Sequence, residues 1–353
     1  MQIIDLAPRC LLDSCTKTYK TDKGCSRYKT YDQFVALTFG QLSKCMSLND
    51  ISAGIGINEK FIDDLNLQQS PARSTMSDGN KNRDWRVFES LYNRLLSHYK
   101  SILKKHHNVH FIKEIKDKNI KLIDSSVIPL CLSLFDWAKF RTAKRGIKLH
   151  TVWSDSLMIP ELVNITTAKV HDRHGLDQLI FPKDTIVVED RVYFDFNLMF
   201  NLKKAIETGI FEHKLRLVHV YKEGENKAIG IITNQLDWKY NTITELYKKR
   251  WDIELFFKAM KQNLRIKTFW GTSENAVKSQ IYVALVCYLL LELIKRTIVK
   301  KPIAFSNLTE KIRFCLYHYL SLDYACNEVR EGVRKVQFKK QRELLFDQDL
   351  FSG

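Results

Sequence analysis

The chain has 353 residues, which is enough to bury a large core and suggests about two domains. An apolar content of 45% excludes an intrinsically disordered chain. Lys and Arg number 56 against 40 Asp and Glu, and the net charge of +16 favours a polyanionic partner such as DNA or RNA, because solubility alone does not require such an excess.

Residues 1–108 are predicted to form a helical domain. Apolar residues recur at helical spacing in YDQFVALTFGQLSKCMSLNDISAGI and again in RDWRVFESLYNRLLSHYKSIL. Basic and aromatic side chains are interleaved around these segments, and short helices of this kind can bring Arg and Lys against phosphates. We therefore expect this domain to bind DNA ends. A helical bundle with an ordinary basic surface is the alternative that the sequence leaves open.

The cysteines and histidines do not form a metal-binding pattern. The eight cysteines are scattered without a CxxC pair, and we predict that they are reduced and mostly buried. His106, His107 and His110 lie close together, but no carboxylate or cysteine stands near them at metal-ligand spacing. We interpret them as part of a polar linker at the domain boundary.

No segment is predicted to enter a membrane. The N-terminal sequence MQIIDLAPRC lacks the basic region and the long apolar run of a signal peptide. The most apolar stretch, residues 281–294, contains Glu292 and is shorter than the ~20 residues that span a bilayer, so it is predicted to be a core helix. We expect the protein in the bacterial cytoplasm, associated with the nucleoid when it is bound to DNA.

Residues 109–197 change to short β-rich runs and are predicted to form the first part of an α/β core. NIKLIDSSVIPLCL predicts a strand interrupted by Asp124 and followed by a second strand, and RGIKLHTVWSD and MIPELVNITTAKVHD predict two more. A carboxylate inside an apolar strand is costly unless it is paired or bound to a cation. A further strand, TIVV, leads directly into Glu189 and Asp190, for which a plain turn residue is the alternative.

Residues 198–240 are predicted to form a short insert that contains β structure. Residues 198–212 favour a helix, and LRLVHVY and AIGIITN flank KEGENK as a hairpin. Residues 241–305 complete the core, and residues 306–353 are predicted to be a helical tail.

One helix is predicted over residues 242–264, TITELYKKRWDIELFFKAMKQNL. Thr242 and Glu245 have the spacing of a capping box at its start. At about 100° per residue, four polar residues fall on one arc beside an apolar stripe: Tyr247, Arg250, Glu254 and Lys261. Taken alone, this arc favours a charged helix surface, since pairs of opposite charge four residues apart are common.

Three acids stand out along the chain: Asp124 in a strand, Asp190 at the end of another, and Glu254 on the helix. This order suits a pair of Mg²⁺ or Mn²⁺ ions, because hard cations take oxygen ligands and keep several waters. Two such ions would serve the attacking and leaving oxygens of an in-line phosphoryl transfer, with water or a DNA 3′-hydroxyl as the nucleophile.

The four residues of the arc reproduce the Y-(2)-R-(3)-E-(6)-K signature of bacterial insertion-sequence transposases of family 4. The surrounding text, from ELYKKRWDIELFFKAMKQNL through FWGTSENAVKSQIYVAL, resembles the same family. IDSSVIPLCLSLFDWAKFRTAKRGIKLHT is similar to the region of its first Asp, and VVEDRVYFD to the region of its second. The N-terminal segments are similar as well, so the resemblance covers nearly the whole chain.

This resemblance implies a DDE enzyme with a ribonuclease-H-like catalytic core, in which a mixed sheet is flanked by helices. It implies that Asp124, Asp190 and Glu254 hold the metal ions. It also implies that the enzyme nicks a transposon end, forms and reopens a hairpin, and joins the end to target DNA. Synapsis of two ends implies a dimer in the DNA complex.

The resemblance further implies that Tyr247, Arg250 and Lys261 hold DNA phosphates near the cut. Arg191, beside the second Asp, and Lys148 are additional expected DNA contacts. For Lys148 and its neighbour His150, a structural role fits the sequence as well as a place in the same groove.

Two departures from the family pattern support other hypotheses. Val192 stands where the family usually has Gly, and a β-branched residue would strain a turn that needs positive φ. Only 63 residues separate Asp190 from Glu254, so the β insert is short. The alternatives are a decayed or non-catalytic DNA-binding relative, and a ribonuclease-H-like nuclease without strand transfer.

Overall fold

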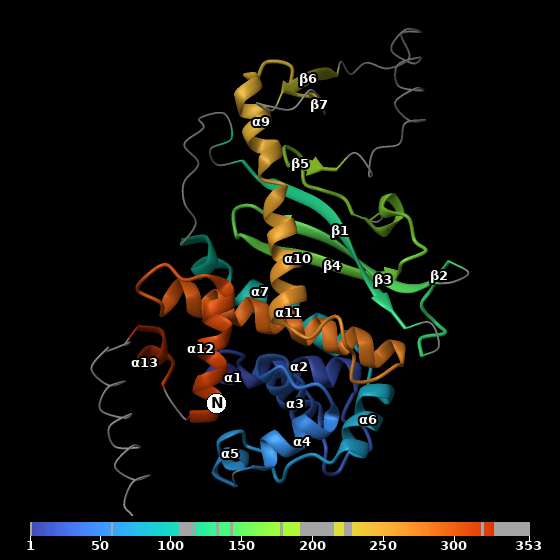
Figure 1. The fold of residues 1–353 in the computed structure, drawn as a ribbon, viewed down its shortest axis with the longest axis vertical. Helices are drawn as coiled ribbons and strands as arrows, with labels where there is room; N and C mark the ends of the chain where they lie inside the picture. The colour runs from blue at the N-terminus through green and yellow to red at the C-terminus, as the bar shows by residue number, and fades with distance from the viewer. Residues whose placement is uncertain are drawn as a thin grey trace, which may run out of the picture.

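The computed structural model describes residues 2–57, 59–105, 115, 118–131, 134–141, 144–176, 179–190, 215–221, 228–318 and 321–327. Figure 1 shows a mixed α/β fold, in which most of the helices lie below a mixed sheet. Three predictions lie outside the described residues: the histidine group at 106–110, the helix at 198–212, and the pair Arg191 and Val192.

The N-terminal part is helical, as predicted. Its elements are α1 (Gln2–Asp5), α2 (Arg9–Tyr19), α3 (Thr30–Ser43), α4 (Leu48–Gly56), α5 (Glu59–Asp64), α6 (Arg73–Asn82) and α7 (Arg86–Lys105). Helix α3 is buried over almost its whole length, including its polar Gln33 and Gln41. It is therefore an internal helix, and its buried glutamines donate hydrogen bonds to other parts of the chain.

The sheet contains the strands β1 (Ile120–Leu130), β2 (Lys139–Arg141), β3 (Lys144–Ser154), β4 (Ile159–Thr167) and β5 (Ile186–Glu189). β3 pairs antiparallel with β1 on one side and with β4 on the other, and the short β2 pairs with its beginning. β5 lies parallel to β1. The predicted strands are thus confirmed, except that β1 is one long strand where two were expected.

The helix predicted over residues 242–264 is two helices, α9 (Tyr240–Lys248) and α10 (Trp251–Asn263). Between them Lys249 and Arg250 keep right-handed helical backbone angles, but their amides bond to carbonyls three residues back. A turn with this tighter pattern shifts the phase of the following helix. The sequence predicted one helix because the apolar periodicity continues across this turn and neither Gly nor Pro interrupts it.

The capping box predicted at Thr242 and Glu245 was wrong. Helix α9 begins earlier, at Tyr240, and its N-cap Lys239 makes no side-chain cap. Thr242 is only 4% exposed within the first turn, so its hydroxyl does not face an open helix end. Glu245 pairs instead with Lys248 at 2.6 Å on the surface.

Helix α10 covers the face of the sheet that carries Asp124. The β1–β3 register places Asp124 opposite Thr151, and Trp153 two residues further along β3 points to the same side. The Trp153 ring contacts the ring of Phe256 in α10, with centroids 5.7 Å apart. The opposite face is covered by the short helix η2 (Asp172–Leu176).

Helix α11 (Glu274–Thr297) is the core helix that the apolar stretch predicted, and every residue from 279 to 294 is buried. In Figure 1 it crosses between the sheet and the N-terminal helices. Its length and composition would suffice to cross a membrane, yet 94% of its most apolar window is buried inside the fold. Helix α12 (Phe305–His318) packs against it, and α13 (Leu322–Asn327) follows.

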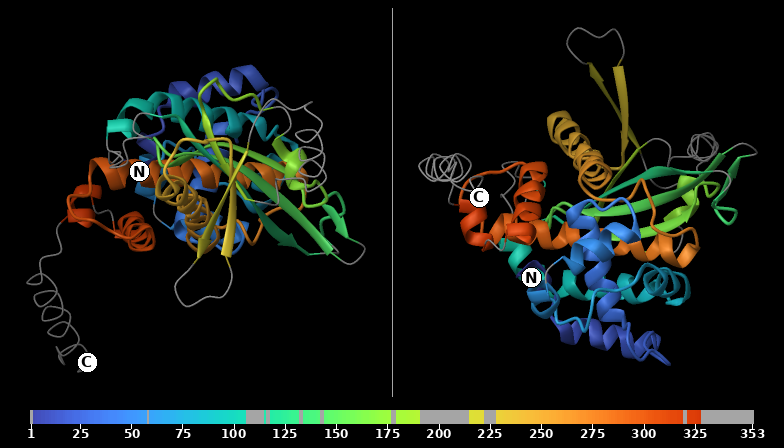
Figure 2. Two further views of the ribbon diagram at one scale, coloured as in Figure 1. Left: turned by 90° about the horizontal axis from the view of Figure 1, so that it is seen from above. Right: turned by 60° about the horizontal axis from the view of Figure 1, so that its bottom comes forward.

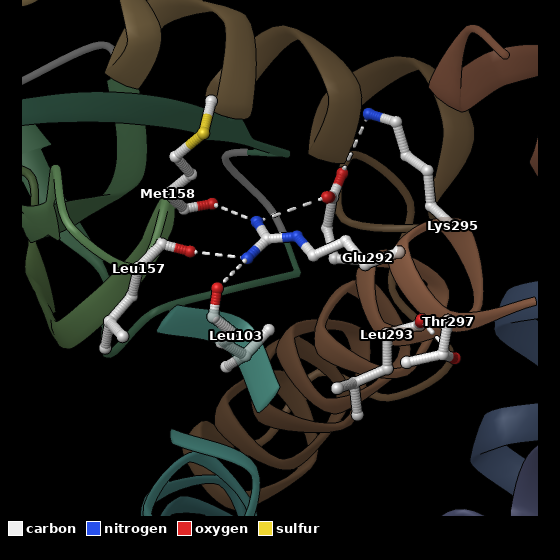
Figure 3. A network of polar contacts seen from close by, with 8 residues as sticks. Leu103, Leu157, Met158, Glu292, Leu293, Lys295 and Thr297 are labelled. Carbon is white, nitrogen blue, oxygen red and sulfur yellow. Dashed lines mark hydrogen bonds and ion pairs between the residues drawn. The ribbon is translucent and has the colours of Figure 1, made fainter. Parts of the chain in front are cut away.

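The C-terminal end of α11 is tied to two other parts of the chain through Arg296 (Figure 3). Its guanidinium donates to the carbonyl oxygens of Leu103, Leu157 and Met158, and it lies 3.5 Å from a carboxylate oxygen of Glu292. These bonds join the end of α7 and the turn between β3 and β4 to α11.

The hairpin predicted in the insert is confirmed as β6 (Arg216–Tyr221) and β7 (Ala228–Thr233), which pair antiparallel. Figure 2 shows it standing away from the N-terminal helices, beside α9. Val218, Ile231 and Ile243 form a small apolar cluster of their own between the hairpin and α9.

The contact between Phe256 and the sheet should carry a large part of the stability of this face. Phe256 is 1% exposed and contacts both Trp153 and Tyr288. We expect Phe256→Ala to lower the free energy of unfolding by about 3–5 kcal/mol, as measured by urea denaturation. Its neighbour Leu255 is 50% exposed, so Leu255→Ala should stay within about 0.5 kcal/mol of the parent. Equal losses in the two variants would contradict this packing.

Candidate active site

Three acids from three elements meet one guanidinium. Arg250 Nη1 lies 3.1 Å from Asp124 Oδ2 and 3.7 Å from Asp190 Oδ2, and Arg250 Nη2 lies 3.0 Å from Glu254 Oε1. We refer to Asp124, Asp190 and Glu254 as the acid cluster. The structure thus brings the three predicted acids together, and it brings them together around Arg250.

The strand register explains why the acids converge. Asp124 follows Ile123 in β1, and Ile123 pairs with Glu189, the last residue of the parallel strand β5. Asp190 directly follows Glu189, so it lies next to Asp124 across the two parallel strands. Glu254 lies in the first turn of α10, where a carboxylate is stabilised by the positive end of the helix dipole.

A second ion pair ties the turn between α9 and α10 to the sheet. Lys249 Nζ lies 2.9 Å from Asp155 Oδ1, and the Asp155 side chain is 3% exposed. Asp155 directly follows β3, and its amide donates to the carbonyl of Ile120 at the start of β1. Arg250 is the next residue after Lys249, so this anchor fixes the backbone from which the guanidinium extends.

The acid cluster is crowded with negative charge. Burial raises the pKa of Asp124 to about 6, and the neighbouring Asp190 and Glu254 act in the same direction, while a backbone amide and Arg250 oppose them. The Asp190 and Glu254 side chains are 33% and 35% exposed, so the cluster opens to solvent on their side. One guanidinium cannot neutralise three carboxylates, and the site keeps a negative charge.

The remaining signature residues extend this site along the helices. The Tyr247 ring centroid lies 5.8 Å from Arg250 Cζ. Lys261 Nζ donates to Ser126 Oγ at 2.6 Å, two residues along β1 from Asp124 and on the same face. Burial lowers the pKa of the Lys261 ammonium. The four residues of the signature therefore lie along one side of the sheet, despite the turn between the helices.

A groove of about 590 Å³ opens next to the acid cluster, between β5, β7 and α9. Asp190 and Tyr247 line its end, and Trp238 and several aliphatic side chains form its walls.

Comparison with known proteins identifies the family to which this arrangement belongs. Residues 115–290 match the family described as the transposase DDE domain. The chain belongs to the DDE transposase family. Members of this family act on DNA and use divalent metals. A second match covers residues 1–62, which resemble a domain of unknown function (DUF4372).

Individual relatives carry transposase names. The chain is 26% identical over 212 residues to a probable transposase for insertion sequence element IS5377 from Geobacillus stearothermophilus, covering 49% of this chain and 56% of the relative. It is 29% identical over 218 residues to a protein assigned as transposase y4zB of Sinorhizobium fredii, covering 50% of this chain and 61% of the relative. A protein assigned as the transposase of IS4SA in Synechocystis sp. is 26% identical over 68% of this chain and 76% of its own length. The chain therefore spans less than two thirds of the first two relatives.

Lys148 and His150 lie on the other face of the sheet from Asp124. Lys148 Nζ lies 3.3 Å from Asp172 Oδ1 and donates to the carbonyl of Val170 at 2.9 Å. His150 is fully buried, and burial lowers its pKa to about 4, so the ring is neutral at pH 7. The two side chains do not line the groove beside Asp124, and their packing supports the structural role. A DNA contact by Lys148 stays a prediction.

The sequence did not reveal two features of this DDE family member. Asp155 and Lys249 were not singled out, because an acid after a strand and a lysine on a helix are both common. Arg250 was expected to face DNA, and its contacts with the acids depend on the turn that the periodicity missed. Among the described residues, no three His, Cys, Asp or Glu side chains already surround a common metal position.

The raised pKa of Asp124 predicts a stability gain when this acid is removed. Because the folded pKa, about 6, lies above the ordinary value of 3.8, the folded state binds this proton more tightly, and the stability it contributes below pH 4 is lost as the pH rises through 6. Asp124→Asn should therefore raise the free energy of unfolding by about 1–2 kcal/mol at pH 8 and leave it nearly unchanged at pH 4.

Urea denaturation in EDTA at both pH values would measure this difference. Asp13→Asn supplies the control, since it makes the same chemical change at an exposed surface position, where the side chain is 54% exposed. A loss of stability in Asp124→Asn at pH 8 would show that the Arg250 ion pair outweighs the burial of the carboxylate.

Proposed function

We propose that the protein cuts transposon ends and joins them to target DNA by metal-dependent phosphoryl transfer. The observation that carries this proposal is the convergence of the acid cluster from two adjacent strands and a helix in a member of the DDE family. The net charge of +16 suits a DNA substrate, and the transposase names of the relatives support the same activity.

The acid cluster is proposed to hold the divalent cations. All of its donors are carboxylate oxygens, which suit Mg²⁺ or Mn²⁺ better than the softer metals that prefer nitrogen and sulfur. Its charge remains negative beside Arg250, so it still attracts cations. When two ions are bound, they would supply activation of the attacking oxygen and stabilisation of the leaving oxygen.

Phosphate contacts are assigned to Tyr247, Arg250 and Lys261, which follow one side of the sheet. A guanidinium offers phosphate a planar fork, an ammonium offers a point charge, and a tyrosine offers a hydroxyl and a ring face. Arg191 is assigned to the same group from its place in the sequence beside Asp190.

The remaining parts of the chain are assigned by the same proposal. Residues 1–108 would bind the terminal repeats, residues 109–197 and 241–305 would form the ribonuclease-H-like core, residues 198–240 the insert, and residues 306–353 the tail. The mixed sheet with α10 on its acid-bearing face supports such a core. Two chains would bring two DNA ends together, in the bacterial cytoplasm or on the nucleoid.

Cleavage and joining can be tested on a plasmid that carries the inverted repeats flanking the coding region. With Mg²⁺ or Mn²⁺, the parent should cut at the repeats, and Asp124→Asn, Asp190→Asn and Glu254→Gln should each lose more than about 100-fold in rate, because each removes a direct metal ligand. The control is Glu245→Gln, an exposed acid on α9 that should keep the activity of the parent.

The products separate the proposal from its alternatives. Cut ends without joined products would identify a nuclease, and salt-sensitive DNA binding without cutting would identify a non-catalytic relative. Undiminished cleavage by the three acid variants would overturn the site.

The proposed phosphate contact of Lys261 predicts a change in salt dependence. Lys261→Gln should weaken binding to a repeat-containing duplex and reduce the slope of log affinity against log salt by about 1. Lys300→Gln, an equal charge change at an exposed position beyond α11, should leave the slope unchanged. Fluorescence anisotropy over a range of KCl concentrations measures both, and equal slopes in the two variants would remove Lys261 from the DNA surface.

A further inference from the structure

Arg250 is the only side chain in the described part of the molecule that joins all three acids of the cluster. Nη1 lies 3.1 Å from an oxygen of Asp124 and 3.7 Å from an oxygen of Asp190, and Nη2 lies 3.0 Å from an oxygen of Glu254. The Arg250 side chain is 15% exposed, so it lies within the cluster and not over its rim. The guanidinium thus stands among the carboxylate oxygens that a metal ion would need.

This arrangement leaves Arg250 incompletely satisfied. Its Nε is buried and has no hydrogen-bond partner. A buried donor without a partner is costly, so the contact with the acids is not the best that a guanidinium can make. A phosphate offers Arg a bidentate acceptor, and Tyr247 with its neighbouring groove marks a side from which such a group could approach.

A guanidinium and a divalent cation repel each other and compete for the same oxygens. While the acids hold Arg250, one oxygen of each is already engaged, and the guanidinium charge opposes a metal ion at the remaining oxygens. A DNA phosphate that engages Arg250 would release these oxygens and at the same time remove the repelling charge. Binding of the one ligand would then favour binding of the other, and the coupling must be equal in both directions.

We propose that Arg250 is an internal counter-cation that occupies the acid cluster in the DNA-free protein and yields it to divalent metal when a DNA phosphate engages the guanidinium. This inference rests on the proposed function, because it takes the acid cluster as the metal site. It adds an order of events, in which DNA binding precedes tight metal binding. Tight metal binding is thereby confined to the complex with DNA.

Direct measurement of Mn²⁺ binding tests the competition without any cleavage. Free Mn²⁺ is measured by electron paramagnetic resonance in DNA-free samples of the parent, Arg250→Gln, Lys248→Gln and the double variant Arg250→Gln/Asp124→Asn. Lys248→Gln is the matched control, since it removes the same charge from an exposed position that pairs with Glu245. We expect Arg250→Gln to bind Mn²⁺ at least about tenfold more tightly than the parent, within the usual range of coupling between sites.

The controls locate the gain in affinity. Lys248→Gln should bind Mn²⁺ as the parent does, and the double variant should lose the gain. Equal Mn²⁺ affinity in the parent and in folded Arg250→Gln would overturn the proposal. An equal gain in Lys248→Gln would also overturn it, because the effect would then follow net charge and not the position of Arg250.

A second arm uses the parent protein, so it decides the question even if Arg250→Gln does not fold. Adding a short duplex with a terminal repeat should raise the Mn²⁺ affinity of the parent about tenfold, after subtraction of Mn²⁺ held by the duplex alone. Asp124→Asn should show no such rise. An unchanged affinity in the parent would overturn the coupling.

Failure of this inference is distinguishable from failure of the proposed function. The three acids could be required for cleavage while neither Arg250→Gln nor added duplex changes the Mn²⁺ affinity. That result would support the proposed function and contradict the counter-cation role of Arg250. If the double variant binds Mn²⁺ as tightly as Arg250→Gln, Asp124 is not a metal ligand, and the proposed site falls with it.

Discussion

The packing of Phe256 between Trp153 of the sheet and Tyr288 of α11 sets the distance on which the candidate active site depends. A helix that carries one ligand must be held at a fixed height above strands that carry the others, and aromatic rings hold such a spacing with few internal degrees of freedom. The positions of the side chains in the acid cluster then follow from this packing. The acid cluster lies beside an apolar layer that holds α10 against β1 and β3.

Gathering three carboxylates at this point opposes folding, because each loses water and repels the other two. The chain offsets part of this cost with one guanidinium and with the dipole of α10. The cost is characteristic of a site built for a ligand, since an apolar residue at position 124 would suit the strand better. Stability and function compete at this position, as they do where a protein keeps a group for its chemistry.

Much of the fold could be predicted from local patterns. The strands around Asp124 and the hairpin of the insert follow alternation and turn composition, and α11 follows a continuous apolar run. Asp124 was found because a charge inside an apolar strand needs a partner. Asp190 and Glu254 were singled out at a strand end and on the polar arc of a helix, and the family resemblance assigned their roles. The turn before Arg250 could not be found in this way, since Lys249 and Arg250 are good helix formers and the tighter hydrogen bonds arise from packing. The face of Lys148 depends on the pairing of two strands, and the start of α9 depends on the burial of Thr242. Both depend on contacts between residues that are distant in the sequence, so a local sequence pattern cannot predict them.

The hairpin and α9 share a small apolar cluster, formed by Val218, Ile231 and Ile243. Trp238 and Tyr247 pack against both this cluster and the main core, and Leu246 of α9 belongs to the main core. The next residues along the chain are Lys249, held by Asp155 at 2.9 Å, and Arg250. The insert is therefore attached to the fold through the same short segment that presents the guanidinium to the acids, so one support positions both the insert and the site.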